Sequence, residues 1–276
     1  MTPPAVLLVG HGSKDMEGNL DFLRMAERAK ARFPGRLMRS CFIEYCDPGV
    51  PAGLDLLVKE GARGITVVPV ILFAAGHVKV EVPGYLDAFR ERHPAVSVRY
   101  AAPLGIQSGL FPVLERQVRA VEAARGWDAD RSRTAALLIG RGSSDPDANG
   151  DLHKIARLLW EGRGFLDAQV CFSGITHPRF AEGVRRCVAV GARRIVLLPY
   201  FLYTGILLKR LQRQAEEFRP LYPGVDWGFA GELGHEEAIL DVVAARAAEA
   251  EAGEVRMSCD LCRWRLAGEE RQTHAH

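Results

Sequence analysis

The chain has 276 residues, of which 48% are hydrophobic and 25% are charged, and its formal net charge is +2. These values are typical of a globular protein large enough for two domains of common size. A near-neutral chain without a long run of Lys or Arg does not favour a nucleic-acid partner. The longest apolar stretches are interrupted by Pro69 and Pro199 and fall short of the roughly 18 residues that span a bilayer, so we expect no membrane segment.

The N-terminal residues run directly into an apolar, strand-like segment, without a positively charged start and a cleavable apolar region. We therefore expect a cytoplasmic protein. In that compartment disulfides are rare, and Cys41, Cys46, Cys171 and Cys187 are predicted to be free and buried within regular structure.

Strands and helices alternate along the first half of the chain. We predict strands at 5–10, 37–44, 65–72 and 96–101, and helices at 17–33, 50–60, 82–92 and 107–124. Short, almost wholly apolar strands that alternate with helices indicate an α/β fold, in which a parallel sheet is flanked by helices on both faces.

The second half repeats this order. The predicted strands are 134–139, 168–174, 195–200 and 225–229, and the predicted helices are 147–161, 179–190, 207–221 and 236–250. A polar stretch with Gly126 separates the halves, and the apolar pattern ends at Gly253. We therefore predict an N-terminal domain at 1–125, a linker at 126–133, a C-terminal domain at 134–252 and a tail at 253–276.

The two halves also share a sequence repeat at an offset of 130 residues. Leu7–Asp15 aligns without a gap on Leu137–Asp145, and the register continues through Asn19/Asn149, Cys41/Cys171 and Lys79/Lys209. Pro94 matches Pro223 at an offset one residue shorter, so copy two lacks one residue between Lys209 and Pro223. We expect such a deletion to lie in a loop.

Three polar groups exist only in the first copy. His11, Glu44 and His77 are replaced by Arg141, Gly174 and Leu207 in the second. Each follows a predicted strand, and in a doubly wound sheet with strand one between strands two and three the three ends share one rim. Two imidazoles suit a divalent cobalt, iron, nickel or zinc ion, and a carboxylate accepts protons. The first copy is therefore predicted to be active and the second to be a degenerate scaffold.

The residues around His11 have a predicted structural role. Gly10 and Gly12 allow a sharp turn and the close approach of a large flat ligand to the backbone. Ser13 and Asp15 occur in both copies, so we expect them to cap the following helix and not to take part in chemistry.

These motifs resemble the sirohydrochlorin chelatases, in particular the long, two-domain sirohydrochlorin cobaltochelatases. The segments that carry the resemblance are Leu7–Ser13 with Asn19, Phe42–Glu44 with Pro48, and Val68–Lys79 with Pro83. The resemblance covers essentially the whole chain and implies two tandem chelatase-like domains.

The resemblance also implies a lyase activity, the insertion of a divalent metal into sirohydrochlorin or a precorrin-2 type tetrapyrrole that carries eight carboxylates. The family's metal-binding histidines match His11 and His77, and its acidic residue matches Glu44, so these three are the predicted catalytic residues. No organic cofactor is implied. Co²⁺ insertion for cobalamin synthesis is the first expectation, and Fe²⁺ insertion for siroheme synthesis is the alternative.

The tail contains a Cys-x-x-Cys pair, Cys259 and Cys262, followed by His274 and His276. Some long members of the resembled family carry such a pair in an iron–sulfur centre. Two thiolates are half of the usual ligand set, so a second chain or other residues would complete it. A zinc or cobalt site that uses both His, or an incidental thiol pair, are the alternatives.

A cobalt or nickel carrier, which holds metal on His11 and His77 without chemistry, is the main rival function. A histidine-type phosphatase is disfavoured because Gly10, not Arg, precedes His11, and a serine hydrolase is disfavoured because no Gly-x-Ser-x-Gly motif follows a strand. The expected partners are the tetrapyrrole and the metal, and a homodimer is an assembly that the sequence leaves open.

Overall fold

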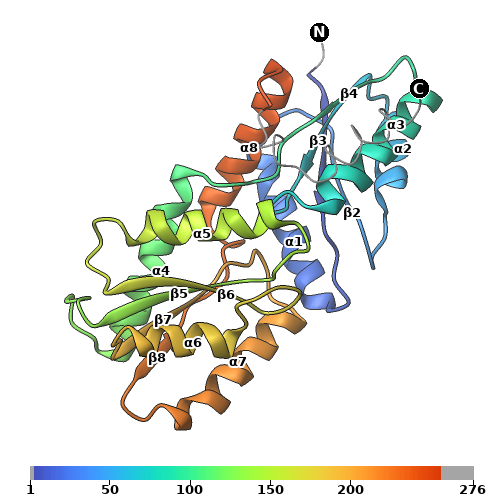
Figure 1. The fold of residues 1–276 in the computed structure, drawn as a ribbon. Coiled ribbons are helices and arrows are strands. Elements are labelled where there is room, and N and C mark those ends of the chain that lie inside the picture. The colour runs from blue at the N-terminus through green and yellow to red at the C-terminus, as the bar shows by residue number, and fades with distance from the viewer. Residues whose placement is uncertain (1–2, 256–276) are drawn as a thin grey trace, which may run out of the picture. The chain divides into compact units, whose positions relative to one another are not determined.

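The structure is a computed structural model that describes residues 3–255 (Figure 1). It contains two four-stranded parallel sheets with the orders β2-β1-β3-β4 and β6-β5-β7-β8. Helices flank each sheet, which confirms the predicted α/β fold with two repeated parallel sheets (Figure 1). β1 and β5 are the inner strands between the second and third strands of their copies, as the site prediction requires.

The first sheet lies in a unit formed mainly by the N-terminal part of the chain. Its elements are β1 (Ala5–Gly10), α1 (Met16–Ala29), η1 (Lys30–Arg32), β2 (Met38–Phe42), α2 (Val50–Lys59), β3 (Gly64–Pro69), the π-helix η2 (His77–Glu81), α3 (Val82–Arg92) and β4 (Ser97–Tyr100). α2 and α3 cover one face, where Leu54, Leu57 and Phe89 pack on Leu7 and Val67. All five of these side chains are buried, because a parallel sheet must be covered on both faces.

The second sheet lies in a unit whose strands alternate with helices in the same way, after an initial helix. Its elements are η3 (Ser108–Leu110), α4 (Phe111–Arg125), β5 (Thr134–Gly140), α5 (Pro146–Trp160), β6 (Asp167–Phe172), α6 (Phe180–Ala189), β7 (Arg194–Pro199), α7 (Ile206–Phe218), η4 (Arg219–Leu221) and β8 (Asp226–Phe229). α6 and α7 cover one face through Val184, Leu211 and Ala215. The last helix within residues 3–255 is α8 (Glu237–Ala252).

The compact units divide the chain differently from the sequence copies. Of the described residues, unit 1 contains 3–105 and 240–255, and unit 2 is Ile106–Ile239. α4 therefore packs on β7 and β8, and the side chain of Val121 lies so close to Gly228 that a Cβ there would meet it at 2.4 Å. The predicted boundaries at 125 and 134 describe the sequence repeat, whereas packing divides the chain at the helices that close each copy.

α8 is held in unit 1 by polar contacts. Glu251 accepts hydrogen bonds from the Arg36 guanidinium at 2.5 Å and from the Thr66 hydroxyl at 2.8 Å. Arg32 forms an ion pair with Asp241 at 2.8 Å. The helix that ends copy two thus completes the unit that contains the copy-one sheet.

The predicted linker is part of unit 2. Within it, the guanidinium of Arg131 is 9% exposed and binds the carboxylates of Glu122 at 2.5 Å and Glu115 at 2.9 Å. Both acids lie on α4, and these two carboxylates raise the pKa of Arg131, with the hydrogen bond to Glu122 contributing most. The segment after α4 is therefore anchored to the helix.

Replacement of Arg131 by methionine is expected to lower the free energy of unfolding of unit 2 by about 3 kcal/mol or more, because two carboxylates lose a largely buried partner. Trp127, Trp160 and Trp227 lie in unit 2, so their emission during urea denaturation reports on this unit. The fourth tryptophan, Trp264, lies outside the described residues and is replaced by phenylalanine in all proteins compared. Arg119→Met is the matched control, since Arg119 also pairs with Glu115 but its side chain is 74% exposed. Equal losses in the two variants would contradict the assigned role of Arg131.

The one-residue difference between the copies does not lie in a loop, contrary to the prediction. In unit 1 the backbone N–H of Val82 donates to the carbonyl of His77, a five-residue spacing that defines the π-helix η2. The corresponding α7 of unit 2 is an ordinary α-helix. A π turn holds one residue more than an α turn, so the extra residue of copy one is accommodated inside a helix, directly after His77.

The cysteine prediction holds for three of four residues. Cys41, Cys171 and Cys187 are buried and free, and burial raises the pKa of the Cys187 thiol to about 12. Cys46 is free but only half-buried, because it lies in the loop after β2. Among the described residues, no helix is long and apolar enough to span a bilayer.

Candidate metal and proton-transfer site

His11 is held in a tight loop that begins where β1 ends. Gly12 has φ +85°, and a Cβ at this position would lie 1.8 Å from the carbonyl oxygen of Glu44. A Cβ at Gly10 would meet the ring of Phe22 at 2.9 Å. The turn predicted here is confirmed, and protein atoms occupy the space that a Cβ at either glycine would need.

Polar side chains fix the rest of this loop. The amide N–H of Ser13 donates to Asn19 Oδ1, Asn19 Nδ2 donates back to the Ser13 carbonyl, and both distances are 2.8 Å. Asp15 caps α1 by accepting from the amide of Glu17. Ser143, Asn149 and Asp145 form the same bonds in unit 2, which confirms that Ser13 and Asp15 are structural.

Glu44 lies just beyond the end of β2. Its amide N–H donates to the carbonyl of His11 at 2.9 Å, and the preceding amide of Ile43 donates to Gly10 at 3.0 Å. These bonds extend the pairing of the neighbouring strands past their ends. The residues that carry the imidazole of His11 and the carboxylate of Glu44 are therefore fixed relative to each other by the backbone.

His77 is the first residue of the π-helix that follows β3. β3 pairs with β1 on the side opposite β2, so the segment that carries His77 reaches the same rim from the other side. His77 and Glu44 are 30% and 33% exposed, which leaves the site open to a ligand but shields it partly from water.

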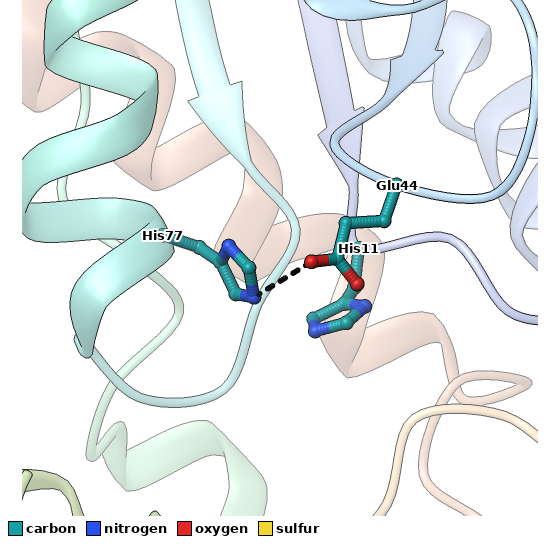
Figure 2. A group of neighbouring side chains, drawn as sticks. All are labelled: His11, Glu44 and His77. Atoms are coloured by element: carbon teal, nitrogen blue, oxygen red, sulfur yellow. Dashed lines mark ion pairs between the residues drawn. The ribbon is translucent and has the colours of Figure 1, made fainter. Parts of the chain in front are cut away.

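The structure brings all three predicted residues together (Figure 2). Their potential ligand atoms lie within 4.8 Å of one another. His77 Nε2 is 3.7 Å from Glu44 Oε1, and the two imidazole rings meet edge to face with centroids 4.8 Å apart. Two donor atoms bound to one divalent ion at about 2.1 Å can be at most about 4.2 Å apart, so only small side-chain movements are needed to hold an ion.

Hydrogen bonds select the tautomer of each imidazole. The carbonyl of Gly12 can only accept, so His11 Nδ1 at 2.9 Å must carry the proton. His77 Nδ1 likewise donates to the carboxylate of Glu81 at 2.6 Å. In the neutral form of each ring Nε2 then has the lone pair, as a metal ligand requires.

Glu81 is a residue of this site that the sequence analysis missed. It lies four residues after His77 in η2, and its second oxygen accepts a hydrogen bond from the hydroxyl of Tyr85 at 3.0 Å. This bond raises the pKa of Tyr85. A carboxylate on the same helical face as a candidate ligand was the signal that could have identified it.

The corresponding rim of unit 2 carries none of the three donors. Arg141 follows β5, Gly174 follows β6 and Leu207 lies in α7. Cys259 and Cys262, together with His274 and His276, lie outside the described residues. Among residues 3–255, the structure offers one cluster of three or more metal-binding side chains, and it is His11, Glu44 and His77.

Comparison with known proteins agrees with the tandem arrangement of this fold. The sequence profile of the CbiX family matches the chain twice, at residues 5–121 and 135–250. The chain belongs to the CbiX family. Both matches include a closing helix of one copy, so the family profile follows the sequence repeat and not the two packed units.

Relatives of this CbiX-family chain include two proteins of Priestia megaterium. A sirohydrochlorin cobaltochelatase is 37% identical over 98% of this chain and 87% of its own length. A sirohydrochlorin ferrochelatase is 32% identical over 77% of this chain and 78% of its own length.

Solved structures show the same two-unit fold. SirB from Bacillus subtilis with Fe³⁺ superposes with a TM-score of 0.79 at 27% identity, over 93% of this chain and all of that one. The sirohydrochlorin chelatase SirB from Bacillus subtilis subspecies spizizenii in complex with cobalt has a TM-score of 0.75 at 26% identity, over 92% of this chain and 97% of that one.

Proposed function

We propose that this CbiX-family protein is a sirohydrochlorin cobaltochelatase, which inserts Co²⁺ into the reduced tetrapyrrole. The observation that carries the proposal is the convergence of His11, Glu44 and His77 at one rim, within 4.8 Å. The 37% identity to a cobaltochelatase over nearly the whole chain supports the choice of reaction.

In the proposed reaction His11 and His77 hold the incoming cation through Nε2. Coordination by two imidazoles removes part of the hydration shell before the ion meets the ring nitrogens, and it places the ion over one face of the macrocycle. Glu44 and Glu81 add negative charge beside the imidazoles, which favours a dication at this place.

Glu44 is the proposed proton acceptor. Insertion requires that two pyrrole N–H groups lose their protons while the four ring nitrogens replace the other ligands of the cation. A carboxylate whose oxygen is 3.7 Å from His77 Nε2 lies beside the position of the ion, so it can take one of the two protons as a nitrogen binds the metal, and the other proton leaves to water.

The preference for cobalt is tested by initial rates with Co²⁺ and Fe²⁺ under anaerobic conditions. Imidazole and carboxylate groups bind both ions, so the donor set alone does not decide the metal. The proposal predicts faster insertion of Co²⁺, seen as the change in the visible spectrum of sirohydrochlorin at catalytic protein concentrations. Faster insertion of Fe²⁺ would favour the ferrochelatase, and a change limited to one equivalent per chain would favour a metal carrier.

We further expect Glu81→Gln to weaken the binding of Co²⁺ about 10- to 100-fold, since removal of a carboxylate that orients a ligating imidazole has this typical effect. Calorimetric titration of Co²⁺ without tetrapyrrole measures this directly. Asp87→Asn is the control, because Asp87 lies on α3 and pairs only with Arg90 in the described structure. Unchanged affinity in Glu81→Gln would show that His77 does not need its orienting carboxylate.

A further inference from the structure

The rim of unit 2 has the opposite charge character from the rim of unit 1. At the repeat offset, Gly174 replaces Glu44, while Arg179 and Arg210 replace Gly49 and Val80. Arg179 directly precedes α6 and Arg210 lies in the first turns of α7, so both flank the loop after β6. Copy two has therefore lost a carboxylate and gained two guanidinium groups around the same position.

The two guanidinium groups converge on the space above Gly174. A Cβ placed on Gly174 would lie 3.7 Å from Arg179 Nη1 and 3.9 Å from Arg210 Nη2. Arg210 is also oriented by a hydrogen bond from Nη2 to the carbonyl of Ser173 at 2.6 Å. The position that a carboxylate-bearing side chain occupies in unit 1 is thus bordered in unit 2 by two sets of N–H donors and by the carbonyl oxygen of Arg141, at 3.8 Å.

Neither guanidinium forms an ion pair with a carboxylate within residues 3–255. The acid nearest in sequence, Glu182, is already engaged, because it accepts from the amide of Arg179 at 2.6 Å and from His177 Nδ1 at 2.7 Å. Two half-buried cations that share one space repel each other unless an anion lies between them.

We propose that unit 2 binds a carboxylate group of a ligand between Arg179 and Arg210, above Gly174. Guanidinium groups bind carboxylates through paired N–H···O bonds, and a fixed pair of them is suited to this group. If the proposed chelatase function holds, one of the eight carboxylates of the tetrapyrrole is the first source of this group. A small polycarboxylate is the second.

The first test compares the full-length protein with the double variant Arg179→Gln/Arg210→Gln. Binding of citrate and of metal-free sirohydrochlorin is measured by titration in the absence of metal. The expected result is at least about a tenfold loss of affinity, because hydrogen bonds to a charged group are removed. Arg213→Gln is the control, because Arg213 is an exposed arginine on the same helix. This variant should bind citrate and sirohydrochlorin with the affinity of the unchanged protein.

A second pair of variants tests the same space without removing the arginines. All atoms near a Cβ at Gly174 lie at 3.7 Å or more, so a side chain fits there. Gly174→Glu supplies the protein's own carboxylate and is expected to compete with citrate, whereas the neutral Gly174→Gln supplies no charge and should compete much less. Circular dichroism of each variant establishes that it is folded.

Loss of affinity for sirohydrochlorin in the double variant supports the proposal and assigns the site to the substrate. Loss for citrate alone supports it and assigns the site to a separate polycarboxylate. Affinities equal to those of the unchanged protein for both ligands overturn it. Citrate binding without metal does not depend on chelation, so a protein that binds citrate here but inserts no metal would refute only the chelatase function.

Discussion

Replacement of His11 or of His77 by alanine is expected to reduce the rate of chelation by about a thousandfold or more. Each change removes one of two imidazoles that we assign to the incoming metal, and metal coordination contributes several kcal/mol to such reactions. Both side chains are partly exposed at a loop and at a helix start, so the fold should remain intact. Chelatase assays and circular dichroism on the same preparations measure the two effects separately.

His177→Ala is the matched control for both variants. Like His77, His177 donates through Nδ1 to a glutamate, in this case Glu182, at 2.7 Å. However, it belongs to unit 2 and its side chain is 69% exposed. A control variant that lost as much activity as His11→Ala, or a His77→Ala protein with near-normal turnover, would remove the assigned roles.

Glu44→Gln is expected to lower turnover about 10²- to 10⁴-fold, the range typical of a lost general base, while Co²⁺ binding without tetrapyrrole weakens much less, since a neighbouring charge and not an imidazole ligand is removed. The amide keeps the size of the side chain but cannot accept a proton from a pyrrole N–H as a carboxylate does. Stopped-flow measurement of insertion at saturating Co²⁺ and tetrapyrrole isolates this step from binding.

Glu44 and Glu81 provide an internal comparison, because both carboxylates lie against His77 but on opposite ring nitrogens. Glu44→Gln should lower turnover at saturating metal, and Glu81→Gln should mainly lower metal affinity. If both variants instead showed the same pattern, with only weaker metal binding, Glu44 would be a ligand or an orienting group and not the proton acceptor.

Much of the fold follows from the pattern of apolar residues. The strand Ala5–Gly10 was predicted with the bounds that the structure shows, because all six residues are buried and the apolar run ends at a glycine turn. The sheet order then placed His11 between Glu44 and His77, and the structure brings these residues together. The residues that gather at one rim of a parallel sheet can be predicted, because the carboxyl ends of its strands meet there.

The sequence could not predict that the helix closing copy one packs in unit 2 and the helix closing copy two packs in unit 1. α4 and α8 occupy equivalent places in the two copies, and both carry apolar residues that need a sheet to cover, Val121 and Val243 among them. Local sequence specifies that each helix is buried on one side, but it does not specify against which of two similar sheets.

The π turn after His77 was missed for a related reason. The offset between the copies shows that one residue is inserted, but an insertion inside a helix and one in a loop leave the same trace in the sequence. In the structure the extra residue is held by the bond from Val82 N–H to the His77 carbonyl, and Glu81 is bonded to His77 Nδ1. The four-residue spacing from His77 to Glu81 was a signal in the sequence, but the bond that makes Glu81 the orienting carboxylate is seen only in this geometry.

The most direct test of the assigned site is anomalous diffraction at the cobalt edge from crystals of the full-length protein grown with Co²⁺ and without tetrapyrrole. We predict a cobalt peak in unit 1 within about 2.1 Å of Nε2 of both His11 and His77 and beside the Glu44 carboxylate. A cobalt ion bound elsewhere, with no peak between these two imidazoles, would contradict the assignment.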